Sequence, residues 1–251
     1  MINYESFKKW HNSFTKKKSR PWWYWKTVQI FMNKGIKLKG DTLSLENDQL
    51  LKIYNQNILT SELKNQIQVS TDNLWTLDAE TLNFLWAECN INKPKIILEF
   101  GSGISTKLFY QYFAEYPQNQ FLLISIDQDQ FYLTKTLNAL RSDLTNVTHH
   151  PMNFPTGNNG FMLNHELIEN IIKKYGEIDF VLIDAPYGAW EARLNTLPSI
   201  LNYCKKNALW FLDDAFRDSE MEILRKWKGN NEIKIEGIVN IGKGIAKGFV
   251  K

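Results

Sequence analysis

The chain has 251 residues, of which 43% are hydrophobic, and this is enough to bury a full core as one large domain or as one domain with a helical extension. No run reaches the roughly 18 consecutive apolar residues of a membrane span, and the amino terminus lacks the apolar core of a signal peptide. The two cysteines, Cys89 and Cys204, lack the spacing of metal ligands, so we expect buried free thiols in a protein of the reducing cytoplasm.

The basic residues are concentrated at the start of the chain. Residues 1–40 hold ten Lys and Arg against the single acidic Glu5, whereas residues 41–251 hold 20 against 26. Aromatic side chains are interleaved with the lysines, most densely at residues 22–25. Such a segment fits an anionic partner, whether nucleic acid, an acidic carrier protein or a membrane surface. We favour a helical arm whose aromatic side chains pack on the rest of the chain while its lysines stay solvated.

Helices are expected through the first third of the chain. Proline and glycine bracket a helix at about residues 21–34, and residues 43–59 have room for another. Residues 78–86 show the i, i+3, i+4 apolar spacing of an amphipathic helix, with Asp78 as its cap. We place a boundary near residue 90, which gives a helical extension at 1–90 that is able to share the core of an α/β domain at 91–251.

The most informative stretch is an apolar run that opens into a glycine turn. Residues 96–98 are apolar, Glu99 and Phe100 follow, and Gly101 and Gly103 come next. A short β-branched run bounded by glycine predicts a buried parallel strand, and the residues after the turn predict a helix. Glycine lets the backbone turn sharply and lets a ligand approach it closely. The pattern departs from the dinucleotide-binding Gly-x-Gly-x-x-Gly, so by itself it also fits a plain tight connection.

Three further apolar runs end at acidic residues: 121–127 at Asp127, 179–184 at Asp184, and 208–212 just before Asp213 and Asp214. Asp127 follows Gly103 by 24 residues, near the spacing of about 20 at which an acidic residue meets ribose hydroxyls. Because ligands bind outside the carboxyl ends of parallel strands, we expect these acids and the glycine turn to border one crevice.

In this order the residues resemble the class I S-adenosylmethionine-dependent methyltransferases. The stretch from Glu99 to Thr106 is similar to their first motif, Asp127 to the acidic residue that closes their second strand, and Asp184-Ala185-Pro186 to their fourth-strand motif. The resemblance implies an α/β, Rossmann-like, doubly wound sheet of seven strands with a reversed last strand. The terminal hairpin would be residues 232–239 and 245–250. In that family an amino-terminal extension covers the cofactor or shapes the substrate pocket.

The resemblance implies a binding site for S-adenosylmethionine. The N–H groups of the turn and the helix start suit the carboxylate of the cofactor, and Asp127 suits the ribose diol. The alternative for Asp127 is a helix cap, for which Asp129 is an equal candidate. His150 or Asn153 would flank the adenine ring. The implied cofactor-binding residues are Glu99, Gly101, Ser102, Gly103, Ser105, Thr106, Asp127, Asn153 and Asp184.

Asp184, Asp213 and Asp214 are similar to the ligands of metal-dependent O-methyltransferases of the catechol and macrocin types. Clustered carboxylates without His or Cys suit a hard divalent cation such as Mg²⁺, which would activate a substrate hydroxyl. Without a metal, Asp184 or Asp213 is the general base, or the Asp213–Asp214 pair caps the following helix and meets Arg217. His165 is a further candidate for the general base.

The sequence favours methyl transfer to oxygen on a small hydroxylated substrate, a sugar or a biosynthetic intermediate. An alternative is N-methylation, because Asp184-Ala185-Pro186-Tyr187 approaches the Asp/Asn-Pro-Pro-aromatic motif of amino-methyltransferases, from which Ala185 departs. A weaker alternative is an aminopropyltransferase. A different class of function is a non-catalytic binding or assembly protein that uses the basic arm. Arg193 is expected at a pocket gate, a helix start or the surface, nucleic acid is disfavoured as a partner, and a homo-oligomer is left open.

Overall fold

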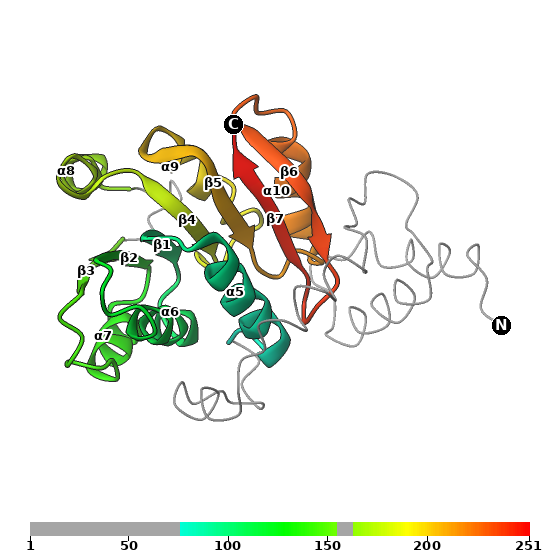
Figure 1. Cartoon of the computed structure of the whole chain (residues 1–251). Helices are drawn as coiled ribbons and strands as arrows, with labels where there is room; N and C mark the ends of the chain where they lie inside the picture. The colour runs from blue at the N-terminus through cyan, green and yellow to red at the C-terminus, as the bar shows by residue number, and fades with distance from the viewer. Residues whose placement is uncertain (1–75, 155–162) are drawn as a thin grey trace, which may run out of the picture.

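The computed structural model describes residues 76–154 and 163–251, which form one sheet flanked by helices (Figure 1). The basic segment and the helices expected at 21–34 and 43–59 lie outside the described residues. In chain order the elements are α5 (Ala79–Asn92), β1 (Ile96–Phe100), α6 (Ile104–Ala114), β2 (Phe121–Asp127), α7 (Gln130–Asn138), β3 (Val147–Asn153), α8 (His165–Tyr175), β4 (Ile178–Ile183), α9 (Thr196–Ile200), η1 (Leu201–Tyr203), β5 (Cys204–Leu212), α10 (Asp218–Trp227), β6 (Ile233–Val239) and β7 (Ile245–Val250).

The strands lie in the order β3-β2-β1-β4-β5-β7-β6. Strands β1 to β5 pair in parallel, whereas β7 runs antiparallel between β5 and β6. This arrangement confirms the doubly wound sheet of seven strands with a reversed last strand. The chain order reverses between β1 and β4, and ligands of such sheets bind outside the carboxyl ends of the strands at this point.

The strand bounds follow the sequence where an apolar run is continuous. Strand β2 covers the predicted residues 121–127, but β5 begins at Cys204, ahead of the expected run at 208–212. Asn207 has a φ of +65°, and the pairing with β4 shifts register between Ile178 and Phe180. Polar residues at the start of β5 carry no hydrophobic alternation, so periodicity did not reveal this part of the strand.

Side chains of the parallel strands alternate between two hydrophobic clusters, one on each face of the sheet. Ile97 of β1 packs in the first cluster with Leu82 of α5 and Leu108 of α6. Its neighbour Leu98 packs in the second, with Ile168 of α8. Figure 1 shows α5 and α6 on one side of the sheet and α8 and α9 on the other. This alternation explains why both faces of the central strands are apolar.

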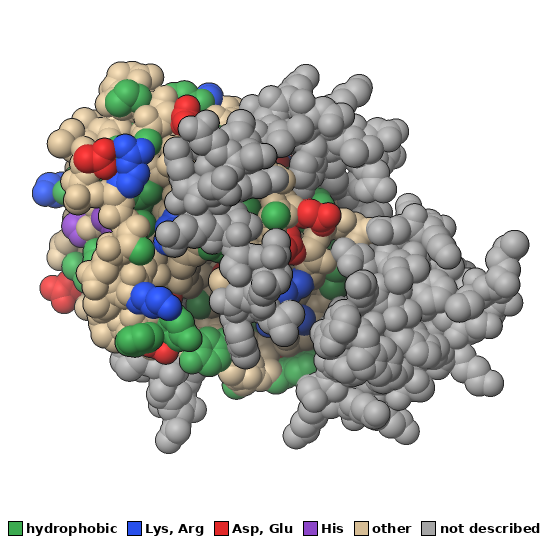
Figure 2. Space-filling model, turned by 90° about the horizontal axis from the view of Figure 1, so that it is seen from below, with side chains coloured by type: hydrophobic (Ala, Val, Ile, Leu, Met, Phe, Trp, Pro, Cys, Tyr) green, Lys and Arg blue, Asp and Glu red, His purple; other side chains and the backbone are tan. Residues whose placement is uncertain are grey.

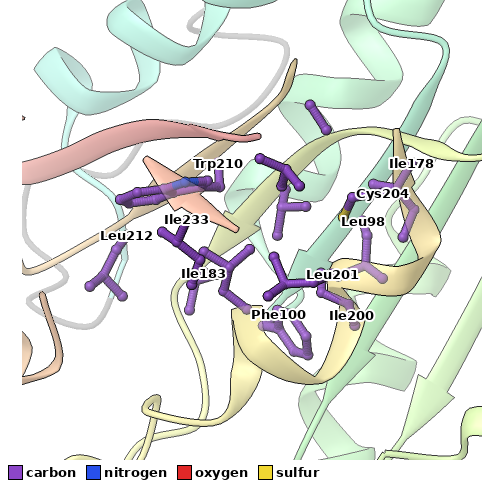
Figure 3. Packing of buried hydrophobic residues seen from close by; sticks show 14 of the residues in the cluster. Leu98, Phe100, Ile178, Ile183, Ile200, Leu201, Cys204, Trp210, Leu212 and Ile233 are labelled. Carbon is purple, nitrogen blue, oxygen red and sulfur yellow. The ribbon is translucent and has the colours of Figure 1, made fainter. Parts of the chain in front are cut away.

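The second cluster fixes the end of β1 ahead of the glycine turn. Phe100 is fully buried in this cluster, and Figure 3 shows it beside Ile200 and Leu201. Its carbonyl accepts hydrogen bonds from the N–H groups of Asp184 at 2.8 Å and Ala185 at 2.9 Å. Burying a side chain of this size stabilises a fold by roughly 1.5–3 kcal/mol, so the turn starts from a firmly held residue.

Helix α5 begins at the predicted cap. The Asp78 carboxylate accepts a hydrogen bond from the Thr81 N–H at 2.8 Å. The large buried apolar side chains of α5 belong to the first hydrophobic cluster, and residue 90 lies inside the helix. The extension expected at 1–90 therefore shares its last helix with the core of the α/β domain.

Both cysteines are free and buried, as expected. Within the described ranges, no helix has the length and apolar character needed to cross a membrane. Figure 2 shows acidic and basic side chains interspersed over the described surface on the face seen there.

Candidate active site

Gly101 and Gly103 turn the chain from β1 into α6 at the carboxyl edge of the sheet. Gly101 has a φ of +97°, which L side chains rarely adopt, and its N–H donates to the Ile126 carbonyl at 2.8 Å. A Cβ on Gly101 would lie 3.2 Å from that of Ala185, whereas a Cβ on Gly103 would meet no atom within 4 Å. The backbone at Gly103 is therefore open to a ligand, as a cofactor-binding turn requires.

Glu99 lies beneath the turn. Its fully buried carboxylate accepts hydrogen bonds from the hydroxyl groups of Ser105 at 2.7 Å, Thr106 at 2.5 Å and Ser125 at 2.6 Å. Burial raises the pKa of Glu99 to about 7, although the three hydroxyl groups act to lower it. The resemblance implied cofactor contacts for Glu99, Ser105 and Thr106. The structure directs their polar atoms to one another, because buried polar groups must be satisfied.

This network continues into β3. His149 Nε2 lies 2.8 Å from Ser125 Oγ, and its Nδ1 lies 3.1 Å from the Tyr110 hydroxyl. Burial lowers the pKa of His149 to about 4, so the ring is neutral at pH 7. The ring of His150, one of the two residues expected beside the adenine, lies 5.7 Å from that of Tyr175. A chain of side chains thus connects the turn with the edge of the sheet.

Asp127 closes β2 beside the turn. Its Oδ2 accepts hydrogen bonds from the Ser102 N–H and hydroxyl, both at 2.7 Å, and its Oδ1 accepts one from the Asp129 N–H at 2.8 Å. Asn153 donates from Nδ2 to the Asp127 carbonyl at 3.1 Å. Asp127 is buried, and the three hydrogen bonds to its carboxylate use three of the about four acceptor positions of an ionised carboxylate.

The N–H groups of the turn were expected to bind the cofactor, but in the structure they donate hydrogen bonds within the protein. The Ser102 N–H is bonded to Asp127, and the Gly103 N–H donates to the Thr106 hydroxyl at 2.9 Å. A folded turn satisfies its own donors in this way. A cofactor carboxylate would have to replace these partners to reach these two groups.

Asp129, and not Asp127, caps helix α7. The Asp129 carboxylate accepts hydrogen bonds from the N–H groups of Phe131 at 2.9 Å and Tyr132 at 3.3 Å. Asp127 is thereby left to the turn and to the crevice.

Asp184, Asp213 and Asp214 meet where β4 and β5 end, as expected. One carboxylate oxygen from each lies within 4.8 Å of the others, because the strands are paired up to the Asp213 N–H, which donates to the Ile183 carbonyl at 3.0 Å. Asp213 and Asp214 are buried, whereas the Asp184 side chain is 25% exposed. Burial raises the pKa of Asp184, and burial together with the two other carboxylates raises the pKa of Asp213 well above its usual range.

Arg193 lies among these carboxylates and is only 3% exposed. Its Nη2 is 3.3 Å from Asp184 Oδ1 and 3.4 Å from Asp214 Oδ2. The guanidinium also donates to the carbonyl oxygens of Asp184, of Pro186 at 3.3 Å and of Asp213 at 3.0 Å. One side chain therefore ties the ends of β4 and β5 together.

The expected surface role of Arg193 is wrong because the side chain is buried, and the expected helix-start role is wrong because α9 begins at Thr196 with Asn195 as its N-cap residue. An isolated arginine in an irregular segment gives no pattern from which burial can be predicted, because its partners follow strands that are distant in the sequence. The paired aspartates were the available signal, since buried carboxylates require a cation or a proton.

Further charged side chains surround the cluster. Arg217 Nη2 pairs with Asp214 Oδ2 at 2.8 Å, as one alternative predicted, but the cap in that alternative is wrong, because Arg217 is the N-cap residue of α10 and no side chain caps this helix. Lys243 Nζ lies 3.7 Å from Asp214 Oδ1, which accepts no hydrogen bond. Glu220 Oε1 lies 3.9 Å from Arg193 Nη1. Among the described residues, the ionised cluster carries one net negative charge, from Asp184, Asp213, Asp214 and Glu220 against Arg193, Arg217 and Lys243.

The charges decide whether these residues fit a divalent cation. Three carboxylates are the donors that Mg²⁺ prefers, but Arg193 Nη2 already lies within 3.4 Å of oxygens of both Asp184 and Asp214. A divalent ion would turn one net negative charge into one net positive charge in a buried site, which costs free energy. The cluster as folded therefore does not fit the Mg²⁺ ion expected on Asp184, Asp213 and Asp214.

His165 lies away from this cluster. It begins α8, and its Nδ1 lies 3.1 Å from the Tyr203 hydroxyl. Tyr203 precedes β5 and Asp213 follows it, so the nine residues of β5 lie between them, about 30 Å of extended strand. Geometry therefore gives no support to His165 as the general base.

Solved methyltransferases share this fold. A methyltransferase from Podospora anserina bound to S-adenosylhomocysteine superposes with a TM-score of 0.58 at 13% identity, covering 82% of this chain and 95% of that one. A methyltransferase from Geobacter sulfurreducens gives 0.50 at 16% identity over 90% and 96% of the two chains. An O-methyltransferase from Bacillus cereus, also with S-adenosylhomocysteine, gives 0.50 at 14% identity over 90% and 98%.

No protein-family model and no curated protein sequence matches the chain. At these identities the structural likeness establishes the architecture alone. The strand order, the reversed last strand and the superpositions agree. The chain therefore has the class I fold of the S-adenosylmethionine-dependent methyltransferases.

Proposed function

We propose that this protein is an S-adenosylmethionine-dependent methyltransferase that methylates a hydroxyl oxygen of a small substrate, a sugar or a biosynthetic intermediate. One observation carries the proposal: the open turn at Gly103, the Asp127 carboxylate and the partly exposed Asp184 follow three adjacent strands of a methyltransferase-type sheet. Two of the superposed proteins are bound to S-adenosylhomocysteine, the product such a reaction leaves.

Three residues at the sheet edge suit the cofactor. The fourth acceptor position of the Asp127 carboxylate suits a hydrogen bond from a ribose hydroxyl. The open side of Gly103 admits the amino-acid part, and the exposed Asn153 side chain beside Asp127 offers polar contacts to the nucleoside. When bound, S-adenosylmethionine supplies an electrophilic methyl group.

Asp184 is the carboxylate that a substrate can reach, because its side chain is partly exposed whereas Asp213 and Asp214 are buried. Asp184 would accept the proton of the substrate hydroxyl as its oxygen takes the methyl group from the sulfonium sulfur, which would keep the electron pair of the broken bond. The raised pKa of Asp184 makes it a stronger base than an ordinary aspartate. Asp213 and Asp214 hold the end of β5 in place beside it.

Nitrogen is the second candidate acceptor, because of the Asp184-Ala185-Pro186-Tyr187 motif. In that chemistry a backbone carbonyl of the motif and a side-chain oxygen hold the amine. Here the carbonyls of Asp184 and Pro186 already accept hydrogen bonds from Arg193. Oxygen is therefore the better-supported acceptor.

A non-catalytic binding protein has no physical reason to keep an open glycine turn beside Asp127. We therefore favour catalysis over that class of function. The two buried thiols suit the reducing cytoplasm. We further propose that the amino-terminal extension is a cover or lid over the substrate, and we leave self-association open.

Calorimetry followed by a transfer assay tests the proposal. We expect S-adenosylmethionine and S-adenosylhomocysteine to bind in the low micromolar range, about 8 kcal/mol, and labelled methyl to reach at least one acceptor in a panel of hydroxylated small molecules. Asp184→Asn should bind cofactor like the wild type but lose turnover by about 100-fold or more. Absence of heat up to about 1 mM cofactor, or full turnover in Asp184→Asn, would overturn the assignment.

A further inference from the structure

We infer that Arg193 is the resident cation of the acidic cluster and that the site therefore gathers its carboxylates without a divalent metal ion. The inference deepens the proposed function, and it rests on that function only where it concerns turnover. It differs from the metal-dependent enzymes that the sequence resembles, in which carboxylates at these positions hold the ion.

The contacts of Arg193 are those of a structural cation. The planar guanidinium presents five N–H donors in a fixed arrangement. Nη2 contacts the side chains of Asp184 and Asp214, Nη1 donates to the Asp213 carbonyl, and Nε donates to the Pro186 carbonyl. A metal ion would gather oxygens in the same way. The guanidinium gathers oxygens that follow both β4 and β5.

The charges lead to the same conclusion. With Arg193 present, the ionised cluster carries one net negative charge, and a divalent ion would reverse the sign. Without the Arg193 charge, two net negative charges would remain, and one divalent cation would cancel them. Removal of the guanidinium should therefore create a metal site where the wild type has none.

Binding of Mn²⁺ tests this inference independently of turnover. Mn²⁺ favours the same oxygen ligands as Mg²⁺, and its free-ion paramagnetic resonance signal is lost on binding. We expect the wild type to leave this signal unchanged up to about 1 mM, where binding is worth about 4 kcal/mol. Arg193→Gln should bind one Mn²⁺ per chain at least about tenfold more tightly. A second substitution, Asp213→Asn, should abolish that gain.

Arg193→Lys is the matched control. It disturbs the same position but keeps the positive charge, so we expect it to bind no Mn²⁺. A role of Arg193 confined to packing predicts no gain of Mn²⁺ in any variant, and a folded Arg193→Gln that binds none would therefore overturn the inference.

Stoichiometric Mn²⁺ binding by the wild type, lost in Asp184→Asn, would also overturn it. This measurement decides the question even if Arg193→Gln does not fold. Methyl transfer by the wild type should proceed at an unchanged rate in EDTA. Failure of the cofactor to bind would count against the proposed function. The Mn²⁺ measurements would still test the role of Arg193, because they need no cofactor.

Discussion

Asp127 and Asp129 are two positions apart and accept hydrogen bonds from different groups. Asp127 holds the Ser102 turn, whereas Asp129 caps α7. Asp127→Asn should weaken the binding of S-adenosylmethionine by about 10- to 100-fold, because a hydrogen bond to a charged group is worth about 1.5–3 kcal/mol. Calorimetry measures the change. Asp129→Asn is the control and should keep the affinity, so an equal loss in both variants would contradict the role of Asp127.

Glu99 connects the stability of the fold to pH. Its pKa is raised from 4.5 to about 7 in the folded protein, so the folded state keeps a proton that the unfolded chain loses. Stability should therefore fall as the pH rises from about 4.5 to about 7. Glu99→Gln removes this loss. Between pH 5 and pH 8, the free energy of unfolding of Glu99→Gln should rise relative to that of the wild type by at most about 3 kcal/mol. Urea unfolding at each pH measures this difference.

His149 changes the stability with pH in the opposite direction to Glu99. The comparison of Glu99→Gln with the wild type subtracts most of this contribution. Its pKa is lowered from 6.5 to about 4, so stability rises as the pH rises from about 4 to about 6.5. Both proteins contain His149, and only the wild type contains the Glu99 carboxyl group. A stability difference that stays constant with pH would show that Glu99 does not titrate in this range.

At the scale of elements, the β1–α6 turn contains two glycines with different requirements. Gly101→Ala places a side chain at a φ of +97°, and it should destabilise the fold by about 1–3 kcal/mol. Gly103→Ala has room for its methyl group in the protein, so it should cost less stability than Gly101→Ala. Its methyl group would occupy the open side of the turn and should weaken cofactor binding by about tenfold or more, or 1.4 kcal/mol. Urea unfolding and calorimetry separate the two effects, and unchanged affinity in Gly103→Ala would place the cofactor elsewhere.

Most elements of the sheet were predictable from local pattern. Strand β2 and the cap of α5 follow from a continuous apolar run and from Asp78. The start of β5 was missed, because residues 205–207 are polar and their pairing with β4 is irregular. Strand pairing, and not propensity, extends β5.

At the scale of the whole molecule, the basic segment at residues 1–40 lies outside the described residues and stays a prediction. We expect it to cover the substrate and not to bind nucleic acid. The full chain should therefore show no steeply salt-dependent affinity for single-stranded or duplex DNA, since phosphate contacts release counterions. Fluorescence anisotropy at low salt and at about 0.2 M salt checks this. Submicromolar binding at low salt that is lost at the higher concentration would contradict it.

The sequence by itself determined the glycine turn and the apolar runs that end at Asp127, Asp184 and Asp213, because each is a local pattern of residue types. The resemblance to a known family implied the strand order, and this order brings Asp184 to Asp213 and Asp214 at the carboxyl edge of the sheet. Only the tertiary structure decided how the charges are balanced. Arg193 comes from an irregular segment, and its partners follow two strands. The fold brings this guanidinium to carboxylates that are distant in the sequence, so no local pattern of hydrophobicity or spacing could predict the contact.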